Sequence, residues 1–225
     1  MKKSLLAGIK CAIFDMDGTI LDSMPMWHTI GKTYLERLGI VPRENLWDEI
    51  KRFNLVESAE YFIEEYGVNR PKETIMDDIR NLISEYYDEK LQLKEGAREV
   101  LEALNEMGIP CVLATATDIE SVLSCMNRLD CTKYFKKILT CLEYNTTKSE
   151  PVIFEKGAEF CGAKPEVSLV FEDALHAIRT AKNAGFKVCA VYDESNEEKT
   201  EPPLTDWERI LEFTDMKCMK LTDLL

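Results

Sequence analysis

The stretch that decides the fold is residues 11–19, which read Cys11-Ala12-Ile13-Phe14-Asp15-Met16-Asp17-Gly18-Thr19. A short apolar run that ends in polar residues and glycine is typical of a buried strand leading into a tight turn. Two carboxylates this close raise each other's pKa, and a divalent cation or a catalytic role relieves the repulsion. The alternative is that Asp15 and Asp17 cap the turn, but a single Asp or Asn would be enough for that. We therefore expect both acids to be functional.

The rest of the chain alternates strands with helices. Short β-branched or apolar runs predict five strands, at residues 10–15, 110–115, 137–141, 168–172 and 187–192. Helical periodicity predicts helices at residues 97–107, 119–129, 152–161, 175–184 and 206–213. Strands that alternate with helices of this length predict a parallel sheet covered on both faces. The fold class is therefore α/β, a doubly wound parallel sheet of the Rossmann-like kind.

One long segment interrupts this alternation after the first strand. Between residues 24 and 94 the sequence has amphipathic helical periodicity, at residues 29–38, 47–53, 58–66 and 72–91, and no convincing strand. Such a block predicts an inserted helical domain. We expect residues 1–22 and 95–225 to form the core and residues 23–94 to form the insertion.

Composition limits the possible partners. The formal net charge is −13, which argues against a nucleic-acid partner, because phosphate backbones require a basic surface. No stretch approaches the ~20 apolar residues that span a bilayer, and Lys10 interrupts any signal-peptide core, so we expect a cytoplasmic protein without a membrane partner. The eight cysteines form no Cys-x-x-Cys pair, which favours reduced thiols. Residues 194–201 predict a charged, solvated loop.

Residues 12–22 (AIFDMDGTILD) resemble the first motif of the haloacid dehalogenase superfamily, in the variety that acts on phosphate esters. The dehalogenases of that superfamily lack the second acid, which is present here as Asp17. The resemblance implies that Asp15 is the nucleophile that forms an aspartyl phosphate. It also implies that Asp17 protonates the leaving group and activates water, while its backbone carbonyl holds Mg²⁺. In the same family the insertion is a small helical cap.

Three later segments match further motifs of the family. Thr115, after the second core strand, matches the Ser/Thr that binds a phosphate oxygen, and the backbone N–H of Ala116 would add to that anion site. Lys148 lies in a segment with Pro151 and Phe154 at the family's spacing, although Ser149 replaces the usual first proline. It would offset the charge of the phosphate.

The last motif is the pair of acids at the end of the fourth predicted strand, Glu172 and Asp173. Alone, such a pair at a helix start commonly complements the helix dipole. With the other motifs it completes a Mg²⁺ site of Asp15, Asp17, Asp173 and Glu172, the last binding directly or through water.

The resemblance leaves three functions open. The first is a Mg²⁺-dependent phosphatase acting on a small phosphorylated metabolite. The second is a phosphosugar mutase of the β-phosphoglucomutase type, although those enzymes have a histidine where Trp27 lies here. The third is a non-catalytic member that binds a metabolite or a partner. Lys51 and Arg52 are candidates for substrate contact in the insertion, with exposed helix charges as the alternative. The substrate and the oligomeric state are not determined by the sequence.

Overall fold

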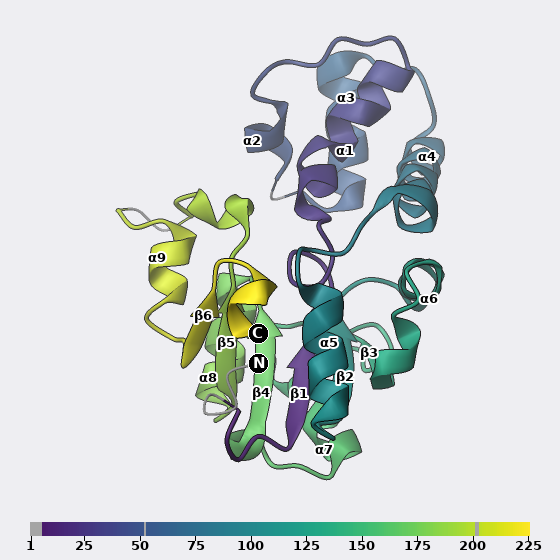
Figure 1. Cartoon of the computed structure of the whole chain (residues 1–225). Coiled ribbons are helices and arrows are strands. Elements are labelled where there is room, and N and C mark those ends of the chain that lie inside the picture. The colour runs from purple at the N-terminus through teal and green to yellow at the C-terminus, as the bar shows by residue number, and fades with distance from the viewer. Residues whose placement is uncertain (1–5, 52, 201–202) are drawn as a thin grey trace. The chain divides into compact units, whose positions relative to one another are not determined.

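The computed structural model of the protein describes residues 6–51, 53–200 and 203–225. The expectations for residues 1–5, Arg52 and Glu201 lie outside the described residues. The chain divides into two compact units, Met1–Asp22 with Gln92–Leu225, and Ser23–Leu91. Figure 1 draws both units and labels their elements.

The first unit contains a parallel sheet in the order β3-β2-β1-β4-β5-β6. Its strands are β1 Cys11–Phe14, β2 Cys111–Thr115, β3 Phe135–Thr140, β4 Ser168–Glu172, β5 Lys187–Val191 and β6 Met216–Cys218. Its helices are α5 Ala97–Glu106, α6 Ile119–Arg128, α7 Val152–Cys161, α8 Leu175–Asn183 and α9 Asp206–Ile210. This arrangement confirms the predicted α/β fold with a parallel sheet.

The sheet has one strand more than the five that the sequence predicted. The additional strand, β6, has three residues and pairs with β5 at the edge of the sheet. It was missed because an edge strand this short carries no buried β-branched run that would distinguish it from a loop. Similarly, β3 begins at Phe135, two residues before the predicted start, and α9 ends at Ile210 rather than at residue 213.

Alternating side chains of the strands build the core of the first unit. Ile13, Val112 and Val170 belong to one buried cluster with side chains of α7, α8 and α9. Phe14 and Phe171, the alternate residues of β1 and β4, stack with their ring centroids 4.2 Å apart. In Figure 1, α5 lies in front of the sheet. Because β1 is central and buried, the residues that follow it are held on a rigid support.

In the described part of the second unit, residues 23–51 and 53–91, the structure has four α-helices, α1 Met24–Arg37, α2 Leu46–Ile50, α3 Leu55–Tyr66 and α4 Lys72–Glu85. A single π-helical turn, Tyr86–Lys90, follows α4, where the sequence predicted one continuous helix to residue 91. The start of α3 is fixed by Asn54, whose side-chain oxygen accepts hydrogen bonds from Val56 and Glu57 at 2.9 and 3.0 Å. These helices enclose a separate hydrophobic core that includes Leu35, Phe62 and Ile79.

The chain leaves and re-enters the first unit through two paired segments. Asp22 N donates to Gln92 O at 3.0 Å, and Lys94 N donates to Ile20 O at 2.8 Å. Residues 92–94 therefore belong to the first unit, whereas helical periodicity placed them in the insertion. Backbone pairing with a distant segment leaves no mark on local periodicity, which explains the difference.

Candidate active site

The carboxyl end of β1 presents the first acid of the site. Asp15 follows Phe14, and its backbone N–H donates to Phe171 O of β4 at 2.9 Å, which continues the sheet ladder. Gly18 turns the chain with a φ of +81°. A Cβ on Gly18 would lie 2.4 Å from Asp173 Oδ2, so only glycine allows the second acidic segment to approach this turn.

Three carboxylates meet at this edge of the sheet. Asp15, Glu172 and Asp173 are buried, and each offers an oxygen within 4.8 Å of the oxygens offered by the other two. They are close because β1 pairs directly with β4, so that the acids following both strands lie at the same edge. Burial, and then the Glu172 carboxylate, raise the pKa of Asp15 to about 8. Burial also raises the pKa of Asp173, with further contributions from Glu172 and Asp15.

A buried lysine from the loop after β3 partly balances this charge. Lys148 Nζ donates to Asp15 Oδ1, and it donates to Glu172 Oε1 at 2.7 Å. Its side chain is only 7% exposed. Burial by itself lowers the pKa of Lys148, but the two carboxylates outweigh burial and the pKa is raised. The ammonium group is therefore charged where it touches the predicted nucleophile.

Hydrogen bonds occupy both oxygens of Glu172. Oε1 accepts from Lys148, while Oε2 accepts from the backbone N–H groups of Asp173 at 2.8 Å and Ala174 at 3.3 Å. This carboxylate fixes the lysine and the turn after β4 at the same time. Such contacts orient neighbouring ligands, as outer-shell groups do around metal sites.

The remaining predicted residues lie on the other side of β1. The Asp17 carboxylate is not one of the three that meet within 4.8 Å among the described residues. Instead, Asp17 Oδ2 accepts a hydrogen bond from the Thr117 hydroxyl at 2.6 Å. Thr115 is buried at the end of β2, and its hydroxyl oxygen accepts from Thr117 N at 3.1 Å. Ala116, between them, is exposed.

Two residues to which the sequence analysis gave no role support Asp173. The Thr19 hydroxyl donates to Asp173 Oδ1 at 2.9 Å, and Asn196 Nδ2 donates to Asp173 O at 3.0 Å. Asn196 is 8% exposed and lies in a short 3₁₀ helix, Glu194–Glu197, so the expectation of a solvated loop is wrong at this position. The loop is anchored by Asp193, whose carboxylate pairs with Lys94 at 2.6 Å. In the sequence, the one sign that Asn196 contributes to the site is that a polar residue lies here, soon after β5.

The donor set fits a hard divalent cation. Mg²⁺ prefers octahedral oxygen ligands at about 2.1 Å, which puts neighbouring ligand oxygens about 3 Å apart and opposite ones about 4 Å apart. The oxygens that Asp15 and Asp173 offer lie within 4.8 Å of each other, close enough for one cation to bind both after a small adjustment of the side chains. Burial and then the neighbouring carboxylates raise the pKa values of the same two acids, and a bound cation would offset both effects.

The fold and the site together define an α/β protein in which acidic residues gather at the carboxyl ends of a parallel sheet. The model of the family described as haloacid dehalogenase-like hydrolase matches residues 12–191. The match spans most of the chain and includes Asp15, Thr115, Lys148 and Asp173. The chain therefore belongs to the haloacid dehalogenase-like hydrolases.

Individual relatives agree with this assignment. A phosphorylated carbohydrates phosphatase of Thermotoga maritima is 29% identical over 80% of this chain and 83% of that protein. Hexitol phosphatase B of Escherichia coli K12 is 25% identical over 96% of this chain and 94% of that protein. Among solved structures, a putative β-phosphoglucomutase from Thermotoga maritima superposes with a TM-score of 0.83 at 26% identity, covering 96% of this chain and 98% of that chain.

No helix in residues 6–51, 53–200 and 203–225 combines the length and the apolar composition needed to cross a membrane.

Proposed function

We propose that the protein is a Mg²⁺-dependent phosphatase that hydrolyses a small phosphomonoester through an aspartyl phosphate on Asp15. The observation that carries this proposal is the buried contact of Lys148 with Asp15 and Glu172, beside the Asp173 carboxylate. A cation next to a carboxylate nucleophile is what an anionic ester needs in order to approach. The relatives named as sugar-phosphate and hexitol phosphatases support the substrate class.

In the first step, an Asp15 carboxylate oxygen attacks phosphorus, the P–O bond to the organic group breaks, and Asp17 protonates the leaving alkoxide. Lys148 balances the negative charge of the phosphate throughout. The Thr117 hydroxyl, 2.6 Å from Asp17, holds that carboxylate in one orientation. Thr115 offers its hydroxyl to a phosphate oxygen, with the backbone N–H of Ala116 beside it.

In the second step, Asp17 removes a proton from water, which attacks phosphorus and releases phosphate with Asp15 regenerated. Asp15, the backbone carbonyl of Asp17 and Asp173 would hold Mg²⁺, and Glu172 would orient Lys148 and Asp173 rather than coordinate. When bound, the cation supplies charge neutralisation for the phosphate oxygens.

The test is phosphate release from a panel of sugar phosphates, hexitol phosphates and phosphoglycolate, with magnesium or with EDTA. We expect activity only with magnesium, and we expect Asp15→Asn to lower it by about a thousandfold or more. The control is Asp22→Asn, since Asp22 is exposed in the same segment. Near wild-type turnover in Asp15→Asn, with circular dichroism showing an unchanged fold, would refute the role of Asp15.

The alternative is a mutase that uses the same intermediate, which the structural likeness to a putative β-phosphoglucomutase favours. The same panel decides between the two. Conversion of β-glucose 1-phosphate into glucose 6-phosphate faster than release of phosphate would identify a mutase.

A further inference from the structure

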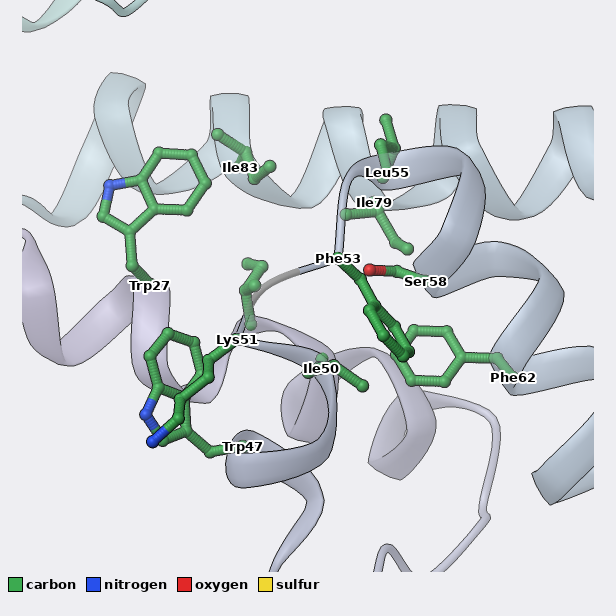
Figure 2. A pocket seen from close by; sticks show the side chains of 12 residues that line it. Trp27, Trp47, Ile50, Lys51, Phe53, Leu55, Ser58, Phe62, Ile79 and Ile83 are labelled. Carbon is green, nitrogen blue, oxygen red and sulfur yellow. The ribbon is translucent and has the colours of Figure 1, made fainter. Parts of the chain in front are cut away.

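The helical unit Ser23–Leu91 contains a pocket of its own, which none of the catalytic residues line. The pocket has a volume of about 380 Å³ and lies between side chains of α1, α2, α3 and α4. Figure 2 shows Trp27 and Trp47 toward one end of this pocket, and Phe53 and Phe62 toward the other. We refer to it as the aromatic pocket.

Contacts with neighbouring side chains hold the aromatic walls of the pocket. Phe62 is fully buried in the core of this unit, so one wall is part of the packed interior. The Trp47 ring rests on His28, with the ring centroids 4.3 Å apart. Phe53 meets the edge of Tyr61 at 5.7 Å. Walls held by such contacts lose less conformational freedom when a ligand enters, which favours binding.

Among the residues that the structure describes, the lining offers few polar partners. Apart from the aromatic rings, five of its side chains are aliphatic, and the polar ones are Ser58 and Lys51. The Lys51 ammonium is already engaged by Asp48 at 3.0 Å. In Figure 2, the Ser58 hydroxyl points into the space between the walls. A polyhydroxylated group placed here would lose its bonds to water without replacement, whereas an apolar ring would lose nothing.

The volume sets the size of the ligand. An apolar cavity of about 150 Å³ is sufficient for benzene. At about 380 Å³, the aromatic pocket has room for two fused rings with one polar substituent. Phe53 is 40% exposed, so a flat ligand that covers its ring also removes apolar surface from water.

We propose that the aromatic pocket binds a small planar aromatic molecule of about two fused rings, with one hydroxyl-sized polar group directed at Ser58. The inference goes beyond phosphatase activity, because it concerns a separate site in the other unit of the chain. It also predicts that a sugar or a hexitol is not the ligand of this pocket.

The experiment uses the full-length protein with ¹⁵N-labelled tryptophan and 2-naphthol as the probe. The chain has three indole N–H groups, on Trp27, Trp47 and Trp207, and only the first two line the pocket. We expect 2-naphthol to shift the signals of Trp27 and Trp47 in a saturable way and to leave that of Trp207 unchanged. Sorbitol should shift none, and decahydro-2-naphthol, which has the same skeleton without the π-system, should bind at least about threefold more weakly.

Two variants and one control locate the binding. Ser58→Leu fills the pocket. Phe53→Ala removes an exposed wall and leaves the buried core intact. The second variant keeps the test valid if Ser58→Leu fails to fold. Each should weaken 2-naphthol at least about tenfold. Val56→Ala, on α3 but outside the lining, should bind as wild type. The proposal is overturned if the wild type shows no saturable shifts, if the folded variants bind unchanged, or if the saturated probe binds equally well.

Discussion

Replacing Lys148 by methionine should destabilise the first unit strongly when magnesium is absent. The ammonium group contacts Asp15, which is 6% exposed, and Glu172, which is fully buried. Methionine keeps most of the volume and leaves both carboxylates without a cation. Removing one partner of a buried ion pair typically costs about 3–5 kcal/mol. With a urea dependence of about 2–3 kcal/mol per molar, the unfolding midpoint should fall by about 1–2 M.

The loss should depend on pH in a defined direction. The pKa of Asp15 is raised to about 8, well above its value of about 3.9 in the unfolded chain. A raised carboxyl pKa costs stability as pH rises above the unfolded value, and the cost is complete above the folded pKa. Without Lys148 the folded pKa rises further, so the variant keeps losing stability above pH 8. We expect the defect to be larger at pH 9 than at pH 6.5 by about 1–2 kcal/mol.

The assay is urea unfolding in EDTA, followed by the fluorescence of Trp207 in a background with Trp27→Phe and Trp47→Phe. Trp207 lies in α9, so it reports on the first unit. The matched control is Lys156→Met, whose ion pair with Glu159 is exposed and should contribute less than about 1 kcal/mol. The reasoning is refuted if the two lysine variants differ by less than about 1 kcal/mol, or if the defect of Lys148→Met shrinks as pH rises.

Three further predictions concern neighbouring contacts. Thr117→Val removes the hydroxyl 2.6 Å from Asp17 and should lower kcat by about 10–100-fold in steady-state kinetics, with magnesium affinity unchanged. Asp193→Asn breaks the pair with Lys94 and should cost about 1–3 kcal/mol in urea unfolding at pH 7. That cost should shrink as pH falls below about 3.9 and disappear below the folded pKa of Asp193, because burial raises this pKa but the pair with Lys94 outweighs burial and lowers it. Gly18→Ala should weaken magnesium at least about tenfold by calorimetry, because the new Cβ would lie 2.4 Å from a carboxylate oxygen.

Each of these has an outcome that contradicts it. If Thr117→Val weakened magnesium binding and left kcat unchanged, the Thr117 hydroxyl would support the metal site and not proton transfer by Asp17. An Asp193→Asn defect that does not shrink as pH falls below about 3.9 would show that packing, not charge, anchors the loop. Wild-type magnesium affinity in Gly18→Ala would mean that the turn adjusts at little cost.

The main elements of the fold and the principal acidic groups follow from local sequence. Apolar runs of strand length mark β1 to β5. Asp15 follows β1 directly, Glu172 is the last residue of β4, and Asp173 follows it. Because the strands are parallel, their carboxyl ends share one edge of the sheet. The proximity of these acids can therefore be predicted without knowing how the side chains are oriented. Roles in catalysis for these residues remain predictions until the variants are measured.

Local sequence alone determined which residues are buried in strands and where acids follow those strands, because both depend on patterns a few residues long. Tertiary structure decided the partners of those acids. The Thr117 hydroxyl donates a hydrogen bond to Asp17, which is 100 residues away in the sequence. Asn196, which lies in a charged segment, donates a hydrogen bond to the backbone carbonyl of Asp173. Tertiary structure also decided that the apolar side chains of the insertion leave a pocket. Periodicity assigns a side chain to a helix face, but the volume left between faces depends on how four helices pack.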